Sequence, residues 1–435
     1  MSAPQKTTIG RFVNLSVMMF ILFFVWGAWF VTVGAFMFNR GMTDHIAWAY
    51  STTPIAAIVT PFFMGVFADR FMNAEKLQGI LMILSGIVIA IAPEFASPEK
   101  ADTFIWILLI HALCFMPNLG LSNTICLKHL ADTERDYPRV RVFATLGWIV
   151  AGIVVSTVLK ADHEVTQFYV AAAAAITVGI YSFFLPKTPP PAKGQKIVFG
   201  DVYGAATLPY FKKFSFAFFM FASLFACVGF MPYWANGATF LGAAGIQEPG
   251  GFLTMGQIAE LFILALVLPI FIKRFGIKWT MIIGMASWIL RYFCFSSAAK
   301  SLHVGGVGET VATGVMALLV AGVVLHGFAY DFVFVSGYLY VDKHVKEEVR
   351  AQAQGLLTVF TQGIGFVLSS QIFAGAVFLK IVGDSGGMNE WKLFWLIPMA
   401  YLGIVFFLFL IFFKEEPRDE VPEKADNVPQ NAADF

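Results

Sequence analysis

Long apolar runs separated by short polar segments dominate the hydropathy pattern of this 435-residue chain. A helix needs about 20 consecutive apolar residues to cross the hydrocarbon core of a bilayer. The pattern therefore predicts an all-α integral membrane protein with twelve transmembrane helices. The predicted spans are residues 12–38, 46–68, 76–94, 103–125, 140–160, 166–186, 214–241, 253–272, 278–298, 310–335, 352–381 and 391–413.

The longest polar interruption, residues 187–213, follows the sixth predicted span and is rich in proline and lysine. We interpret it as a cytoplasmic linker between two six-helix halves, residues 1–186 and 214–414. The tail, residues 415–435, is charged and has no periodicity, which is typical of a disordered segment. Two repeated halves with a solute site between them at the membrane midplane are the plan of many secondary transporters.

Lysine and arginine are distributed unequally between the two sides of the predicted bundle. With both termini in the cytoplasm, 22 of the 29 basic residues fall in cytoplasmic segments, six fall outside, and Arg291 lies within a span. Cytoplasmic loops of membrane proteins carry this excess of positive charge. The expected location is thus the plasma (inner) membrane, crossed many times, with both termini cytoplasmic.

Composition excludes several classes of function. Hydrophobic residues make up 58% of the chain and charged residues 13%, whereas a soluble domain has about 25% charged residues. The net charge of +1 predicts no nucleic-acid partner. The four cysteines have no paired spacing, so we expect no metal site and no cofactor. Because phosphate-binding loops and catalytic motifs are also missing, the sequence favours neither an ATP-driven pump nor an enzyme.

Two carboxylates, Glu260 and Asp331, lie in stretches apolar enough to cross a bilayer. A charge at membrane depth costs at least ~2.5–3.5 kcal/mol, so such residues usually face a bundle interior and mark an ion or substrate path. Both are candidates for proton coupling. The alternative is a structural carboxylate paired with a buried cation, for which Arg291 is a plausible partner of either one.

Helical spacing places further polar residues on common faces. Arg141, Thr145 and Trp148 are four and three residues apart and share one face. Gln257 and Glu260 share another. A cation, a hydroxyl, an amide and an aromatic ring suit a polar solute that contains rings. The alternatives are that Arg141 is an anchoring charge at the cytoplasmic surface and that Trp148 is part of the core.

His326 and Tyr330 are also one helical turn apart. His326 has three open interpretations: a hydrogen-bond donor in the pocket, a member of a proton relay, or an interior histidine that does neither.

Several motifs together resemble a known family. The loop residues Gly65, Asp69 and Arg70 follow the second predicted span and resemble the gate and loop-packing motif of the major facilitator superfamily. Further stretches resemble, more specifically, the bacterial nucleoside:proton symporter family within it. These stretches are Trp26–Trp29, Asp136–Trp148, Gln257–Glu260, Arg274–Lys278 and His326–Phe332.

The resemblance implies the major facilitator fold and a nucleoside site. In residues of this chain, the implied site consists of Arg141, Thr145, Gln257, Glu260 and Tyr330, with the aromatic residue of the fifth-span motif falling on Trp148. Two departures bear on the substrate. The nucleoside permeases of the family have a tyrosine where this chain has His326, and they carry amides early in the seventh span, where Asn236 is the only amide and is not in clean register. His326 and Asn236 are still counted among the candidate solute-binding residues.

The expected function is therefore secondary active import of nucleosides, or nucleoside-like polar solutes, coupled to protons by alternating access. The partners are the solute, protons and the lipid bilayer, and one chain is expected to work as a monomer. One alternative is a proton-coupled transporter of another small polar solute, such as a sugar. Another is a solute sensor on the same fold that does not transport.

Overall fold

The computed structural model describes residues 7–63, 71–190, 204–305, 312–384 and 386–415, and every regular element within these ranges is a helix. Nine helical segments of this part of the chain are long and apolar enough to cross a membrane. The prediction of an all-α membrane protein is thereby confirmed. The loop motif Gly65, Asp69 and Arg70, residues 191–203 of the predicted linker and nearly all of the predicted tail lie outside the described residues.

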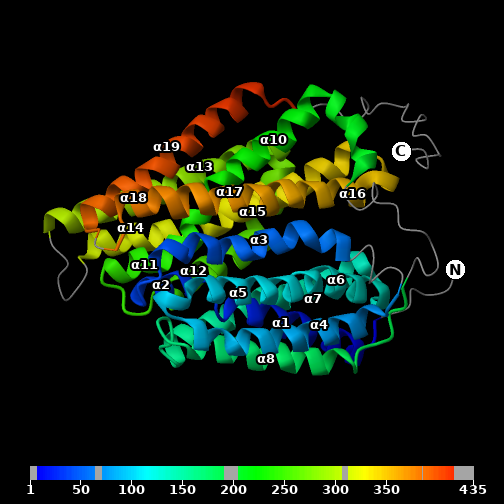
Figure 1. Cartoon of the computed structure of the whole chain (residues 1–435). Helices are drawn as coiled ribbons and strands as arrows, with labels where there is room; N and C mark the ends of the chain where they lie inside the picture. The colour runs from blue at the N-terminus through cyan, green and yellow to red at the C-terminus, as the bar shows by residue number, and fades with distance from the viewer. Residues whose placement is uncertain (1–6, 64–70, 191–203, 306–311, 385, 416–435) are drawn as a thin grey trace, which may run out of the picture.

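The helices form two groups that lie one over the other (Figure 1). The first group contains α1 (Ile9–Gly27), α2 (Val33–Asn39), α3 (Ile46–Phe63), α4 (Ala74–Ile91), α5 (Ala101–Phe115), α6 (Pro117–His129), α7 (Thr133–Gly152), the π-helix η5 (Ile153–Val158) and α8 (Thr166–Ser182). The second group contains η6 (Ala205–Lys212), α10 (Phe214–Val228), α11 (Met231–Ala243), α12 (Pro249–Phe262), η7 (Ile263–Val267), α13 (Leu268–Gly305), α14 (Thr313–Val324), α15 (His326–His344), α16 (Glu347–Thr358), η8 (Val359–Gly365), α17 (Phe366–Ser369), η9 (Ser370–Val377), α18 (Phe378–Ile381) and α19 (Met388–Phe412).

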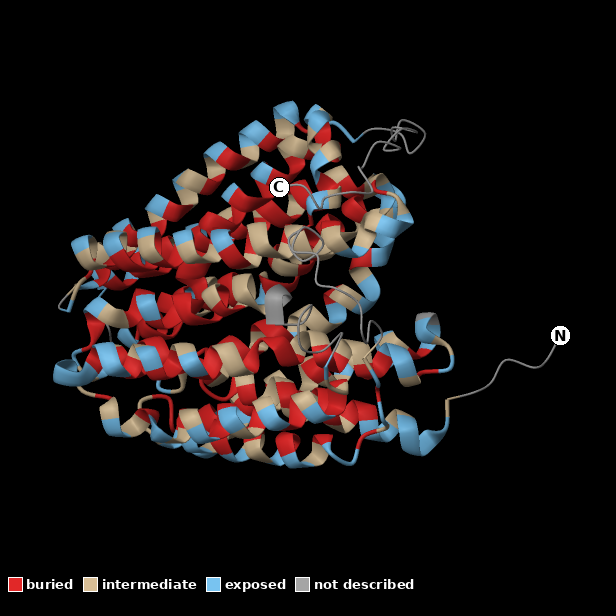
Figure 2. Cartoon of the chain, turned by 45° about the vertical axis from the view of Figure 1, so that its right-hand side comes forward, coloured by how far each residue is buried: buried red, intermediate tan, exposed pale blue. Residues whose placement is uncertain are grey.

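Helices pack along one another within each group, and one large hydrophobic cluster continues across both groups. In the first, α1 packs along α7 and α4 along α8; in the second, α13 packs against α19 and α15. Buried positions gather on the faces between helices, and exposed positions lie on the outside of the bundle (Figure 2). Many of these exposed residues are large and apolar, such as Trp106, Phe184 and Phe407, as expected for a surface that meets lipid rather than water.

Some helices continue beyond the predicted spans. The tenth predicted span ends at residue 335, for example, whereas α15 continues to His344. The physical reason is that the hydropathy pattern reports the thickness of the hydrocarbon core, and backbone hydrogen bonding does not stop at that boundary.

Several helices are interrupted half-way along their length. α10 ends before Gly229, and α11 begins at Met231, just ahead of Pro232, which has no N–H to donate. In a membrane the polar groups that an interruption frees must find other partners. Here the Ser369 hydroxyl accepts from the N–H of Met231 at 2.9 Å, and the Tyr292 hydroxyl donates to the carbonyl of Gly229 at 2.7 Å.

α1 begins and α19 ends at the same end of the bundle, which we call the terminal end; the opposite end is the distal end (Figure 1). At the distal end a buried carboxylate joins the two groups. Asp162 accepts from the N–H of Gly250 at 2.9 Å and from the Ser156 hydroxyl at 2.7 Å, and that hydroxyl accepts from Gly251 at 2.7 Å. Burial raises the pKa of Asp162, and these two hydrogen bonds oppose the shift. The start of α12 is thus tied to the end of η5.

Candidate functional site

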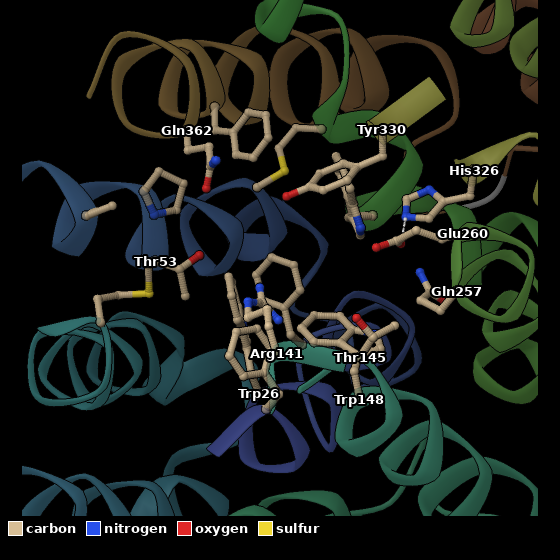
Figure 3. A pocket seen from close by; sticks show the side chains of 18 residues that line it. Trp26, Thr53, Arg141, Thr145, Trp148, Gln257, Glu260, His326, Tyr330 and Gln362 are labelled. Carbon is tan, nitrogen blue, oxygen red and sulfur yellow. Dashed lines mark ion pairs between the residues drawn. The ribbon is translucent and has the colours of Figure 1, made fainter. Parts of the chain in front are cut away.

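A cavity of about 140 Å³ lies between the two helix groups and takes its walls from both (Figure 3). The first group contributes Phe23, Trp26, Phe30, Thr53, Pro54, Ala57, Met116, Arg141, Thr145 and Trp148. The second group contributes Met231, Trp234, Gln257, Glu260, His326, Tyr330, Gln362 and Phe366.

The face predicted for α7 is present and points into this cavity: Arg141, Thr145 and Trp148 all line it. A close approach of α1 to α7 sets this face in place, since a Cβ on Gly147 would lie 2.0 Å from the carbonyl oxygen of Phe20. Only a glycine fits there. Among the described residues the guanidinium of Arg141 makes no ion pair, which leaves its N–H donors for a solute.

Aromatic rings form most of the remaining wall on this side. The Arg141 guanidinium carbon lies 4.4 Å from the Phe23 ring centroid. Trp148 meets Trp26 edge-to-face, with centroids 5.3 Å apart, and Phe30 at 6.2 Å. Aromatic faces held in this way stack on flat rings and hold cations.

The opposite wall carries more of the polar side chains, beside the apolar Met231, Trp234 and Phe366. Gln257 and Glu260 on α12 face His326 and Tyr330 on α15 (Figure 3). Nε2 of His326 lies 3.4 Å from a carboxylate oxygen of Glu260, and the two side chains are 3% and 15% exposed. A carboxylate and an imidazole within ion-pair distance are therefore nearly out of reach of solvent, at the edge of a cavity.

Two glycines hold α12 close to the junction of α14 and α15 at this point. A Cβ on Gly327 would lie 2.7 Å from the Cα of Glu260, and a Cβ on Gly256 would lie 2.9 Å from the carbonyl oxygen of Val323. These contacts are shorter than any real Cβ makes, so larger residues would push the helices apart. The Glu260 to His326 contact depends on this spacing.

Two predicted residues lie away from the cavity. Asn236 on α11 is fully buried, and neither polar atom of its amide has a hydrogen-bond partner among the residues described. Asp331 on α15 is 2% exposed and does not line the cavity, and its Oδ2 has no hydrogen-bond partner within the same ranges. The roles proposed for these two residues stay predictions.

Comparison with known proteins now adds to this geometry. A family model described as nucleoside H⁺ symporter matches residues 9–418. The chain belongs to the nucleoside H⁺ symporter family. The resemblance seen in the sequence motifs is confirmed, and so is the expectation of a transporter rather than an enzyme.

Relatives cover almost the whole length of this symporter family member. The putative nucleoside transporter YegT of Escherichia coli K12 is 34% identical, over 97% of both chains. The xanthosine permease of the same organism is 31% identical, over 94% of this chain and 97% of its own. The crystal structure of the nucleoside transporter NupG superposes with a TM-score of 0.81 at 28% identity, covering 94% of this chain and all of that one.

Sequence reasoning missed part of the cavity wall of this family member. Gln362 and Thr53 are polar residues inside predicted spans, and the argument that singled out Glu260 could have found them. Trp234 and Phe366 carried no such signal, because aromatic residues make up 16% of the chain and most of them serve packing.

No group of three or more histidine, cysteine or acidic side chains is placed to hold a metal ion within the part of the chain that the structure describes. The hydrogen-bonding and ring-bearing side chains of the cavity are suited to an organic solute instead.

Proposed function

We propose that this protein imports nucleosides together with protons by alternating access. One observation carries the proposal: a single cavity between the helix groups brings Arg141 and Trp148 opposite Gln257 and Glu260. A nucleoside has a flat base and a hydroxylated sugar, and the two walls match these two parts.

Each wall has a role in this proposal. The base stacks on the rings around Trp148, and the guanidinium of Arg141 donates hydrogen bonds to the solute. The amide of Gln257 both donates and accepts, which suits a base edge or sugar hydroxyls. Thr145 and Tyr330 complete the set of hydrogen-bonding groups that face the solute, and His326 lines the cavity beside Glu260. Asn236 is buried and does not line the cavity, so it would act on the solute indirectly.

Glu260 is the proposed site of proton binding, with Asp331 as the second candidate. Its carboxylate reaches the cavity, so it can exchange a proton and sense the solute in the same place. Asp331 has no such access from the cavity. One proton moving inward down 100 mV supplies about 2.3 kcal/mol, enough for roughly 50-fold accumulation.

The proposed membrane arrangement is twelve crossings in two six-helix halves of the major facilitator fold, with both termini in the cytoplasm. The nine long apolar segments support it, since Pro249–Gly305 is far too long for one crossing and Gly276 interrupts it with φ 77° and ψ 177°. α3 and α8 supply further crossings. A complete cavity within one chain supports a working monomer.

The packing of the two groups supports alternating access. At the distal end they are joined around Asp162, and a Cβ on Gly34 of α2 would lie 2.3 Å from the carbonyl oxygen of Ala235 on α11. Towards the terminal end the helices of the groups diverge (Figure 2). With the terminal end in the cytoplasm, this arrangement corresponds to an inward-facing state, and the distal contacts must break for the opposite state.

Uptake into proteoliposomes tests the proposal. With an inward proton gradient, labelled nucleoside should accumulate inside, and an uncoupler should abolish the accumulation. Competition by unlabelled nucleosides but not by sugars is expected. If sugars alone compete, the solute is a sugar and not a nucleoside. Accumulation that is driven by a sodium gradient after the proton gradient is dissipated would contradict proton coupling. Binding of nucleoside without exchange across the membrane would indicate a sensor.

A further inference from the structure

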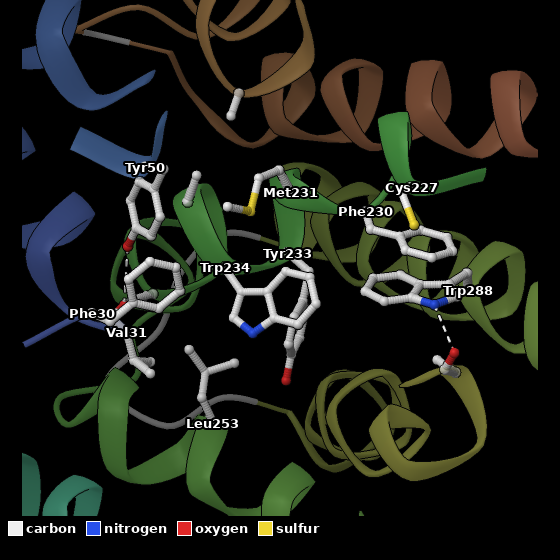
Figure 4. Close-up of a cluster of buried hydrophobic side chains, with 14 of the residues drawn as sticks. Phe30, Val31, Tyr50, Cys227, Phe230, Met231, Tyr233, Trp234, Leu253 and Trp288 are labelled. Carbon is white, nitrogen blue, oxygen red and sulfur yellow. Dashed lines mark hydrogen bonds between the residues drawn. The ribbon is translucent and has the colours of Figure 1, made fainter. Parts of the chain in front are cut away.

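A buried arginine stands directly behind the carboxylate wall of the cavity. Arg291 on α13 is 0% exposed, and it does not line the cavity. Its guanidinium lies over the ring of Tyr233 at 3.8 Å and over that of Trp288 at 4.5 Å, and its Nε donates to the carbonyl of Gly322 at 2.9 Å. Figure 4 shows Tyr233 and Trp288 within a cluster of buried hydrophobic side chains. The guanidinium is thus fixed in one orientation.

The fixed guanidinium meets one nitrogen of a histidine, and the other nitrogen of that histidine meets the carboxylate. Nη2 of Arg291 lies 3.2 Å from Nδ1 of His326. Nε2 of the same ring lies 3.4 Å from Glu260. The ring itself stacks with Tyr233 and Tyr330, with centroids 5.2 and 5.6 Å away. The imidazole therefore has little freedom to turn.

The donor inventory decides where the histidine proton resides. A guanidinium has N–H donors, no acceptor, and does not lose its proton in proteins. Nδ1 of His326 must therefore be the acceptor, and the single N–H of the neutral ring must be on Nε2. Nε2 is the ring nitrogen that lies 3.4 Å from the Glu260 carboxylate. A second proton on Nδ1 would set two donors against each other beside a buried cation.

We propose that Arg291 is a positioning residue that fixes the Nε2–H tautomer of His326 and so makes this histidine a permanent hydrogen-bond donor to Glu260. His326 then holds the carboxylate in place and does not carry the transported proton. The role in coupling rests on the proposed function, whereas the tautomer does not.

The other ionisable groups around the ring leave this assignment unchanged. Tyr233 on α11 and Tyr330 on α15 present ring faces to His326. Arg141 on α7 and Asp331 on α15 interact electrostatically with Glu260 rather than with the histidine. Arg291 is the group that donates to Nδ1.

Heteronuclear NMR of protein labelled at the histidine ring nitrogens tests the tautomer without any transport assay. The His326→Asn variant identifies the signal of His326 among the seven histidines. At neutral pH the wild-type signal should show a bare Nδ1 and a protonated Nε2. A proton on Nδ1, or on both nitrogens, would overturn the proposal.

Three substitutions then separate the donor from the charge. Arg291→Met removes both, so the His326 signal should change and proton-driven accumulation should fall about tenfold, as for a lost charge-assisted hydrogen bond in a buried network. Arg291→Gln keeps a donor and should retain the wild-type tautomer and most of the coupling. Arg291→Lys keeps the charge on a differently shaped donor and should give an intermediate result.

Internal controls separate positioning from folding. The signal of His111, which is buried beside Ser85 in the first helix group, should be the same in all these proteins. Without Arg291, His326 is free to take up a second proton, so the pH profile of uptake by Arg291→Met should show an additional titration step. That step should vanish when His326→Asn is added. An unchanged tautomer together with unchanged coupling in Arg291→Met would overturn the proposal. Absence of nucleoside transport by the wild-type protein would instead contradict the proposed function.

Discussion

The two walls of the cavity differ in chemistry. The wall from the first helix group is largely aromatic around Arg141, with Thr53 and Thr145 as its hydroxyls. The wall from the second group carries Gln257, Glu260 and His326, backed by the buried guanidinium of Arg291.

The difference implies a division of labour. Stacking rings and a permanent cation do not change with pH, so the first wall can bind a solute in the same way whatever the proton gradient does. A carboxylate held by a histidine responds to protons, so the second wall is where proton and solute are linked. Substitutions of the aromatic rings of the first wall should therefore spare proton coupling, whereas Arg141 interacts electrostatically with Glu260 and so connects the two walls. The predictions below test that separation.

Arg141→Ala should have the largest effect, a loss of nucleoside affinity of about 100-fold, because a charge-assisted contact with the solute is removed. The measurement is the Kd of the purified variant. Arg139→Ala is the matched control, since Arg139 lies on the same helix, is exposed and does not line the cavity. Equal Kd values for both variants and the wild type would return Arg141 to the role of an anchoring charge.

Glu260→Gln should abolish accumulation, which is worth roughly 50-fold at 100 mV, while exchange of nucleoside across the membrane continues. Glutamine has nearly the size of glutamate and can still form hydrogen bonds, but its side chain cannot bind and release the coupled proton. Counterflow and gradient-driven uptake in proteoliposomes measure the two activities separately.

Asp331→Asn is the matched comparison for that variant. It should still accumulate nucleoside, because Asp331 does not line the cavity. If Asp331→Asn loses accumulation and Glu260→Gln keeps it, the proton site moves to Asp331. If both variants accumulate nucleoside, neither carboxylate is the proton site.

The sequence predicted some residues of this site and not others, and the difference depends on whether local structure or tertiary packing positions the residue. Spacing on a single helix placed Arg141, Thr145 and Trp148 on one face, because the helical repeat is local. The improbability of a charge in lipid singled out Glu260 and Arg291. The sequence could not tell that Arg291 reaches Glu260 through His326, because three helices must meet for that contact and no local rule fixes their distances.

The interrupted helices illustrate the same limit in the fold. The apolar runs predicted the location of the helices well, since hydrocarbon thickness sets their length. They did not predict the interruption between α14 and α15, where His326 becomes the first residue of the second helix. Leu325, at this junction, is neither glycine nor proline, so tertiary packing rather than local preference positions the break.

Gly327→Ala should weaken nucleoside binding about tenfold, because small displacements of aligned groups cost this much or more. The added Cβ would lie 2.7 Å from the backbone of Glu260, so α12 and α15 must separate. Gly314→Ala on α14 is the control, since a Cβ there meets nothing within 4 Å. Thermal stability should fall and Kd should rise in the first variant only, and similar values for both would show that the spacing at Glu260 is unimportant.

Trp148→Phe should have the smallest effect, a loss of affinity of about three- to tenfold with full proton coupling. The smaller ring keeps an aromatic face but gives up stacking area, and aromatic contacts are worth about 0.5–1.5 kcal/mol beyond burial. Trp391→Phe is the matched control, because Trp391 is equally aromatic, is buried in α19 and does not line the cavity. The Kd should increase for Trp148→Phe alone, while the accumulation ratio at saturating nucleoside stays that of the wild type. A lower accumulation ratio would show that the aromatic wall takes part in coupling, and the division between the two walls would then be wrong.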